Sequence, residues 1–304
     1  MKPIVKRVLI GVGGLIGAVV LGGAAFVGFH VYRFGSSMDK VYEVPLPSVT
    51  LSSDAAVLER GKHLTEAVAG CNAKDCHGAD LGGGKTLEFG PLGKVTGPNV
   101  SKGGLGAAYS PGEVFRLVRH GLKKDGRSVR FMPSHEMGWL PDSDITAIIS
   151  HLETVPAVTK PNGPTELGAM AKVLDRFDMI HLDIARRIDH EKPEIAPPAA
   201  PTAEYGRFLA KLCTGCHGAN LSGGPIPGAP PTLPIPLNIT PHESGMKGWT
   251  YEDFDRLMTT GVKKDGKKLD PFMPIDGFGK MNETEKKALW AHLSTLEPRP
   301  FGGR

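Results

Sequence analysis

A chain of 304 residues is long enough for two domains of ordinary size, each with a core of its own. Its formal net charge of +4 gives no indication of nucleic-acid binding, and its 40 glycines and 26 prolines favour many turns and modest regular structure. All four cysteines fall in two Cys…Cys-His clusters, which leaves none for a structural disulfide elsewhere.

The N-terminal segment is long and apolar enough to cross a membrane. Three basic residues precede an uncharged apolar run over residues 8–29, which at about 1.5 Å per residue matches a hydrocarbon core of roughly 30 Å. We predict a transmembrane signal-anchor over residues 8–32, with a signal peptide cleaved near residues 23–25 as the alternative. Because positive charge precedes the span, the rest of the chain is predicted to face the periplasm from the inner membrane of a bacterium.

The next stretch, residues 35–53, is predicted to be an extended tether, because its two prolines oppose helix. A helix is predicted to resume at Ser53 or Asp54, since either residue can cap a first turn. Residues 53–156 are therefore taken as the first domain.

This helix leads into a cluster of cysteines and histidine. Four residues separate Cys71 from Cys76, and His77 follows directly. Taken alone, the cluster fits a local disulfide, a metal site or the attachment site of a prosthetic group. If it is an attachment site, either the longer loop bulges so that both thiols react, or Cys76 alone forms the bond.

Residues 157–201 are predicted to link two domains, because both of their ends contain several prolines. Within them, residues 167–190 are helical in composition and place apolar side chains near one stripe. We predict a helix that buries this stripe against both domains. An interfacial membrane helix is the alternative, but four aspartates make its polar face too acidic for that.

The second cluster, in a domain predicted over residues 202–299, carries the most specific signal. Cys213, Cys216 and His217 have the CxxCH spacing of a c-type haem attachment site. Each thiol adds to one vinyl group of the porphyrin, and the histidine that follows presents a nitrogen to the iron. A zinc site would need a second pair of ligands at metal-site spacing. We therefore predict covalent haem c here.

The chain is duplicated at a nearly constant offset. CHGADLGGG from Cys76 matches CHGANLSGG from Cys216 at an offset of 140, and the FMP tripeptides at Phe131 and Phe272 match at 141. The alignment predicts one haem in each repeat, and so two covalently bound haem c groups. In the first repeat, Cys71 and Cys76 become the attachment residues and His77 the proximal iron ligand.

Each repeat also contains a methionine in the same local frame. Met132 and Met273 both follow a helix that ends in glycine and a KKDG turn, and both precede proline. We predict that they are the distal iron ligands; ordinary core methionines are the alternative. The fallback ligands are His135, Met137 and Met281, none of which is matched between the repeats.

The remaining histidines have simpler interpretations. His151 and His292 are repeated, but they lie in the final helices beyond the ligand region and are predicted to be structural. Five others have no repeat partner and are predicted to lie on the surface: His63, His120, His181, His190 and His242.

Each repeat resembles a class I cytochrome c domain, with a helix, a Cys…Cys-His motif, a long loop, a helix ending in glycine, a methionine and a final helix. The second repeat, with CTGCHGANLSGG, LNITP and DPFMP, is similar to the multihaem cytochrome c subunits of membrane-bound alcohol and gluconate dehydrogenases, although this chain has two haem motifs where those subunits carry three. The resemblance implies a mainly α fold with two tandem class I cytochrome c domains after the single transmembrane helix.

A haem with histidine and methionine as its axial ligands has no open position for a substrate. We therefore predict an electron-transfer protein rather than an enzyme, anchored in the membrane and passing single electrons outside the cytoplasm. The preferred version is the electron-transfer subunit of a dehydrogenase or respiratory complex. A free-standing relay is the alternative, and a dihaem peroxidase-like enzyme becomes the prediction if one sixth position is open.

The predicted partners are redox proteins, either a dehydrogenase subunit or a terminal oxidase or other cytochrome, together with the membrane. Basic side chains just before each methionine either steer an acidic partner or belong to solvated turns. They are Lys123, Lys124, Arg127, Arg130, Lys263, Lys264, Lys267 and Lys268.

Overall fold

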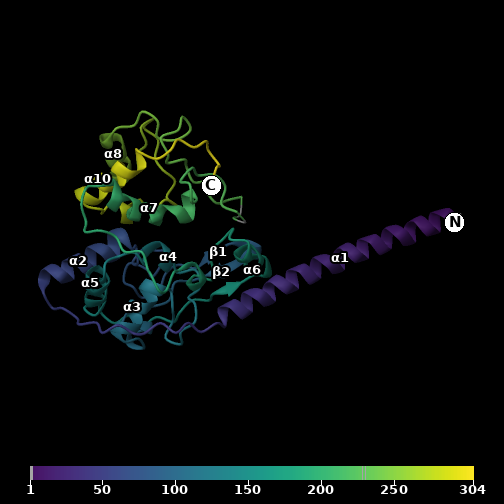
Figure 1. Cartoon of the computed structure of the whole chain (residues 1–304), viewed down its shortest axis with the longest axis horizontal. Helices are drawn as coiled ribbons and strands as arrows, with labels where there is room; N and C mark the ends of the chain where they lie inside the picture. Colours follow the sequence, from purple (N-terminus) through teal and green to yellow (C-terminus); the bar gives the residue numbers. More distant parts are fainter. Residues whose placement is uncertain (1–2, 228, 230) are drawn as a thin grey trace.

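The computed structural model describes residues 3–227, 229 and 231–304. Two lobes form the body of the molecule, and a single long helix, α1 (Pro3–Met38), projects from the first lobe (Figure 1). In the described part of the chain, α1 is the one helix that is long and apolar enough to cross a membrane by length and composition. Its apolar side chains are exposed along most of its length, as a lipid-facing helix requires.

The first lobe is built from helices and a small sheet. Its helical elements are α2 (Ala55–His63), which continues as a π-helical turn over Leu64–Val68, α3 (Pro111–His120), α4 (Ser134–Met137), α5 (Asp142–Leu152) and α6 (Ala169–Arg176). Three 3-10 turns cover Gly90–Leu92, Leu105–Ala107 and Ala185–Arg187. The strands β1 (Leu87–Glu88), β2 (Gly93–Val95) and β3 (Glu166–Leu167) form an antiparallel sheet in that order.

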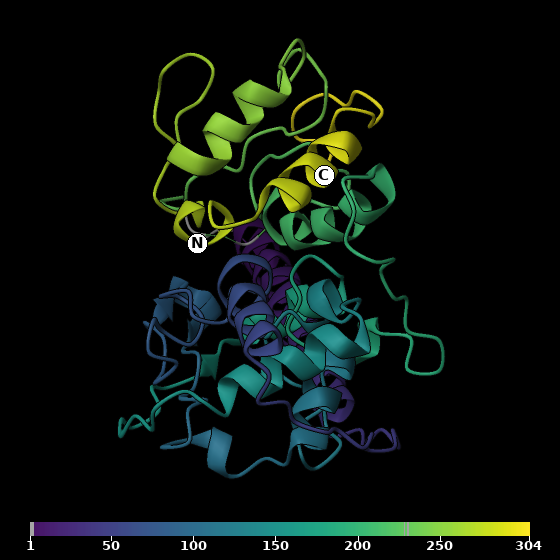
Figure 2. The ribbon, with the colours of Figure 1, turned by 90° about the vertical axis from the view of Figure 1, so that its left-hand side faces the viewer.

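The second lobe consists of α7 (Ala203–His217), α8 (Tyr251–Thr260), α9 (Ile275–Phe278) and α10 (Glu283–Leu293). Its helices follow the same order as α2, α3, α4 and α5 of the first lobe. Figure 2 shows this lobe, in green and yellow, lying over the first. The predicted mainly helical class is confirmed; the small sheet was not predicted, because its strands are too short to show an alternating pattern.

Local signals set the helix ends. Asp54 caps α2 with its carboxylate, as predicted, and Ser110 and Thr250 form capping boxes at the starts of α3 and α8. The glycines predicted to end α3 and α8 do so in the left-handed conformation, with φ of 63° at Gly121 and 69° at Gly261.

Each final helix packs on the helix before its cysteine cluster. The crossing is close in both lobes because a glycine lies at the contact. A Cβ at Gly61 of α2 would lie 2.0 Å from the carbonyl oxygen of Ala147 in α5, and one at Gly206 of α7 would lie 1.9 Å from that of Ala288 in α10. At these two positions the helix backbones are in contact, and any side chain in place of glycine would keep them apart.

The helix predicted over residues 167–190 is wrong in its extent. α6 ends at Arg176, and Asp178 has a left-handed φ of 57°. The physical reason is Asp175, which is fully buried and whose carboxylate accepts hydrogen bonds from the backbone N–H groups of Leu182 and Asp183 at 2.8 and 3.1 Å. These two N–H groups are therefore not available for the hydrogen bonds of a continuing helix.

The apolar residues of this segment do not bury against both lobes either. α6 packs against the end of α1, where Phe34 and Met38 form a small core with Ala171 and Leu182. Phe177 is exposed to solvent but stacks on Phe26 of α1, with ring centroids 6.1 Å apart.

The predicted tether is shorter than expected and is bound to the first lobe. α1 continues to Met38, and the chain beyond it runs along the lobe surface. The N–H of Tyr42 donates to the Gly126 carbonyl at 2.9 Å, and the N–H of Ser52 donates to the Ser150 hydroxyl at 3.1 Å. We call residues 42–52 the docked strap, because these hydrogen bonds hold both of its ends on the first lobe.

The two lobes share one apolar core and several ion pairs. Trp139 of the first lobe packs against Tyr205 and Phe208 of α7. Arg60 and His63 of α2 lie 3.4 and 2.8 Å from the carboxylate of Glu285, which is completely buried at the start of α10. These contacts hold the lobes in one arrangement.

Candidate functional site

The second cysteine cluster forms the C-terminal end of α7. Cys213, Cys216 and His217 lie on its last turns, and Gly218 with φ 81° ends the helix. The His217 ring is buried, and its Nδ1 lies 2.6 Å from the carbonyl oxygen of Leu237. That carbonyl can only accept, so Nδ1 carries the hydrogen and Nε2 keeps a free lone pair.

The first cluster reaches a similar end by a different backbone. Here the helix stops at Gly70, whose φ is 60°, and the cysteines lie on a series of turns. The two additional residues between Cys71 and Cys76 therefore bulge out of the helical path. His77 Nδ1 nevertheless lies 2.8 Å from the Pro98 carbonyl, which fixes the same tautomer as in the second cluster.

The pKa values of both histidines favour the neutral imidazole, which is the form that can bind a metal ion. Burial lowers the pKa of His77 and of His217, and the hydrogen bonds to Pro98 and Leu237 oppose that shift only in part. Each imidazole is then neutral near pH 7 and offers its lone pair, the form in which histidine binds iron.

The four cysteines are free thiols in the structure, so the alternative of a local disulfide between Cys71 and Cys76 has no support. Burial raises the pKa of Cys71 and of Cys213 to about 12. Such thiols stay protonated at neutral pH, unlike the low-pKa nucleophiles of cysteine enzymes. They fit a role as attachment points better than one in catalysis.

The loop after each histidine repeats its backbone conformation. Leu81 and Leu221 share the unusual left-handed φ of 57°. The N–H of Gly83 donates to the His77 carbonyl, and that of Gly223 to the His217 carbonyl, both at 2.9 Å. The sequence repeat is therefore also a repeat of local geometry, including the segment that orients each histidine.

The two methionine frames also match. The N–H of Ser134 donates to the Met132 carbonyl, and that of Ile275 to the Met273 carbonyl, both at 2.8 Å across the proline between them. Both methionines are half-buried, whereas the fallback residues Met137 and Met281 are fully buried in the apolar core. The core accounts for the latter pair. Met132 packs against the edge of that core and, like Met273, keeps part of its side chain exposed.

The basic side chains before each methionine are largely paired with local acids. Lys124 lies 3.9 Å from Glu113, and Lys264 lies 2.8 Å from Asp253. Asp125 and Asp265 accept further pairs inside the two KKDG turns. This pairing supports the solvated-turn interpretation, because neutralised cations steer a distant partner weakly.

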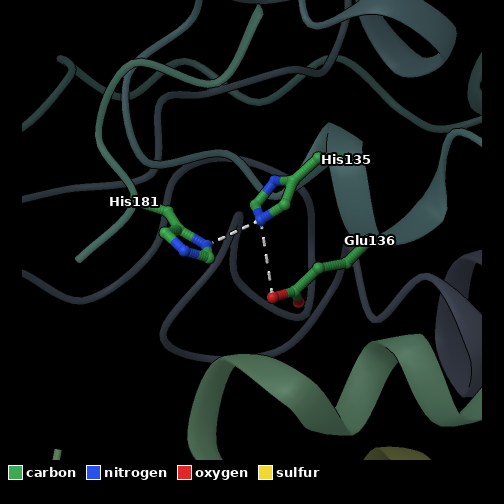
Figure 3. A group of neighbouring side chains, drawn as sticks. All are labelled: His135, Glu136 and His181. Carbon is green, nitrogen blue, oxygen red and sulfur yellow. Dashed lines mark hydrogen bonds and ion pairs between the residues drawn. The ribbon is translucent and has the colours of Figure 1, made fainter. Parts of the chain in front are cut away.

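Several histidines predicted to lie on the surface are half-buried, and that prediction is wrong for them. His63 contacts Glu285, and His120 pairs with His190 at 3.2 Å. His181 lies 2.9 Å from His135, with Glu136 beside them (Figure 3). No sequence signal indicates this last group, because 46 residues separate the two histidines.

Comparison with known proteins identifies the second lobe. Residues 203–297 match the cytochrome c family. The cytochrome subunit of fructose dehydrogenase from Gluconobacter japonicus is 30% identical over 117 residues, which are 36% of this chain and 24% of that protein. The cytochrome c subunit of gluconate 2-dehydrogenase from Pantoea cypripedii is 34% identical over 95 residues, 29% of this chain and 22% of that protein.

The cytochrome c subunit of the quinone alcohol dehydrogenase from Gluconacetobacter polyoxogenes is 33% identical over 97 residues, 30% of this chain and 21% of that protein. The predicted similarity to such subunits is confirmed, while the matched stretch spans less than a quarter of these relatives. A cytochrome c domain carries covalently bound haem c, which agrees with the haem predicted at Cys213, Cys216 and His217 in the matched lobe.

Proposed function

We propose that the chain is a membrane-anchored dihaem cytochrome c that passes single electrons between redox partners on the periplasmic side of a bacterial inner membrane. In this proposal α1 contributes the anchor at residues 8–32, and residues 53–156 and 202–299 are tandem cytochrome c domains joined by residues 157–201. The protein itself is not an enzyme.

The observation that carries the proposal is the repeated histidine geometry. His77 and His217 follow cysteine clusters of different length, yet each donates Nδ1–H to a backbone carbonyl about twenty residues later, at 2.8 and 2.6 Å. This hydrogen bond aims Nε2 away from the loop and raises its basicity as a ligand. A first lobe without haem would have no use for the same arrangement.

The residues of each lobe would divide the work in the same way. Cys213 and Cys216, and in the first lobe Cys71 and Cys76, would form the covalent bonds. His77 and His217 would be the proximal ligands, with Met132 and Met273 as the distal ones. A haem held between histidine and methionine supplies reversible one-electron transfer and leaves no iron position open to a substrate.

The relatives are cytochrome subunits of fructose, alcohol and gluconate dehydrogenases. By similarity, we assign this chain to the electron-transfer subunit of a comparable complex, with the substrate oxidised in another chain. The lobe contact supports transfer between the two haem sites, because Trp139, Tyr205 and Glu285 hold the lobes in one relative position.

The test is to express the chain in a bacterium that matures c-type cytochromes and to measure haem per polypeptide. Two haems are expected, with the methionine–iron charge-transfer band in the oxidised spectrum. Met132→Ala and Met273→Ala should each remove part of that band and admit carbon monoxide, while Met281→Leu, a matched change of a core methionine, should do neither.

The other outcomes discriminate between the alternatives. One haem per chain would remove the first lobe from the proposal. Two haems with carbon monoxide binding in the unaltered protein would instead support a peroxidase-like enzyme with an open sixth position. In addition, Cys71→Ser and Cys76→Ser separate attachment through both cysteines from attachment through Cys76 alone, by whether haem stays bound after denaturation.

A further inference from the structure

A cluster of three ligand-type side chains, none of them assigned to a haem, lies beside the predicted attachment turn of α7. His135 and Glu136 come from α4, and His181 comes from the segment that follows α6 (Figure 3). His135 Nε2 lies 2.9 Å from His181 Nδ1 and 3.7 Å from Glu136 Oε1. All three donor atoms lie within 4.8 Å of one another.

These separations are close to what a tetrahedral ion needs. Zinc bonds of about 2.0–2.1 Å at tetrahedral angles place neighbouring donor atoms roughly 3.3 Å apart. The two distances from His135 Nε2, 2.9 and 3.7 Å, lie on either side of that value. The donor atoms of the third pair, His181 and Glu136, lie within 4.8 Å of each other.

The chemistry of the three groups suits a metal of the zinc class. Burial lowers the pKa of His135 to about 3 and also lowers that of His181, so both rings are neutral near pH 7. Neutral imidazole with one carboxylate is a donor set preferred by Zn²⁺ and Co²⁺ rather than by Ca²⁺ or Mg²⁺.

The surroundings leave the carboxyl group without a cation of its own. The Glu136 side chain is 13% exposed and reaches α7, where a Cβ at Gly215 would lie 2.8 Å from its Oε1. Arg187 is close enough to lower the pKa of both histidines, but its guanidinium is paired with Asp175 and Asp178 at 3.5 and 2.9 Å. Burial raises the pKa of Glu136 to about 8, so a divalent ion would displace the proton of this carboxyl group and stabilise the carboxylate.

We propose that His135, Glu136 and His181 bind one Zn²⁺-class divalent ion, with water as the fourth ligand. The site joins α4 to the segment after α6 at the point where both approach the attachment turn of α7. The ion is structural, because it fixes the linker against the first lobe beside the second haem site. The proposal does not depend on how many haems the chain carries.

The test uses the full, untagged chain in detergent after its maturation and dialysis against a chelator. Titration with Co²⁺, followed by its d–d absorption outside the haem bands and by equilibrium dialysis with elemental analysis, should give one Co²⁺ per chain that Zn²⁺ displaces. His181→Asn and the isosteric Glu136→Gln should each weaken binding by more than about tenfold.

The chain supplies a matched control in its other histidine pair. His120 and His190 are also in contact, at 3.2 Å, but no carboxylate completes a three-ligand group there among the described residues. His190→Asn should therefore leave Co²⁺ binding unchanged. Sub-stoichiometric binding, or equal binding by His181→Asn and Glu136→Gln at unchanged haem content, would overturn the site.

Discussion

At the scale of single residues, two glycines determine how closely each pair of helices can approach. Gly61 and Gly206 have the carbonyl oxygens of Ala147 and Ala288 where a Cβ would be, at 2.0 and 1.9 Å. The obstacle is backbone, which cannot rotate away as a side chain can. The helices must separate to admit even a methyl group.

We therefore expect Gly206→Ala to destabilise the second lobe by about 2–3 kcal/mol, the usual cost of overpacking a well-packed contact. Gly35→Ala is the matched control, because Gly35 also lies in a helix but has nothing within 4 Å of its Cβ position. That variant should keep its stability. Urea unfolding followed by circular dichroism measures both, and equal midpoints would contradict the argument.

A second residue-scale prediction concerns acid stability. Burial, assisted by the nearby His190, Arg119 and Arg116, lowers the pKa of His120 to about 4. The unfolded chain binds this proton near pH 6.5, so between pH 6.5 and 4 the unfolded state holds more protons than the native one. Stability is then full above about pH 6.5 and falls as the pH decreases toward 4.

Because His120 is half-buried, solvent screening reduces the effect, and we expect a loss of about 1 kcal/mol from this group. His120→Gln should decrease the difference between urea midpoints measured at pH 7.5 and pH 5. Identical pH dependence in the variant and the parent protein would show that this histidine does not titrate as the structure indicates.

Sequence patterns predicted the arrangement of neighbouring residues better than contacts between distant segments. The repeat located both histidines and both methionines in matching frames, because each frame is encoded by neighbours in sequence, as with Met132 and Pro133. The group of His135, Glu136 and His181 was missed, since only the folded path of the linker brings its members together.

At the scale of elements, α1 is more than an apolar span. Its last turns are part of the folded body, since Phe34 and Met38 are 3% and 5% exposed and pack with Ala171 and Leu182. A hydropathy pattern cannot show this, because it does not distinguish the apolar residues that are exposed along the helix from those buried against the body.

Two truncations test this division. A chain that begins at Phe34 should leave the membrane fraction, dissolve without detergent and keep its stability. A chain that begins at Asp39 should lose about 4 kcal/mol, because two buried apolar side chains are removed. Equal unfolding midpoints for the two truncated chains would rule out a structural role for the end of α1, and membrane retention of both would contradict anchoring by α1.

The linker shows where an element-level prediction failed. Helical composition and an apolar stripe predicted one helix over residues 167–190, but Asp175 captures two backbone N–H groups and turns the chain after α6. Side-chain capture of this kind depends on burial of the carboxylate, which periodicity does not report.

At the scale of the whole molecule, one buried carboxylate joins the lobes. Glu285 completes the capping box of α10 with Asn282. Its carboxylate also contacts the side chains of Arg60 and His63 from α2. Removing its charge weakens its contacts with Arg60 and His63, although Arg60 keeps Asp144 at 2.8 Å. A hydrogen bond to a charged group typically contributes about 1.5–3 kcal/mol.

Glu285→Gln should therefore cost about 2 kcal/mol and separate the unfolding of the two lobes into two steps in calorimetry. Asp253→Asn is the control, because Asp253 has the same capping position in α8 but forms its ion pairs, among the described residues, with Lys264 and Arg256 of its own lobe. That variant should cost about 1 kcal/mol or less and keep one transition. A single transition in both variants would mean that the lobes are coupled by the apolar contact alone.

The docked strap from Tyr42 to Ser52 has a consequence for how the protein finds its partners. A cytochrome on a long free linker explores a hemisphere whose radius is set by the linker, so it can serve acceptors at several heights above the bilayer. Here α1 enters the first lobe directly, and its last turns pack into that lobe through Phe34 and Met38. With α1 in the bilayer, both lobes would lie at one fixed height above the membrane. The protein would then meet partners by lateral diffusion, and only those with redox centres at the same height would be reached.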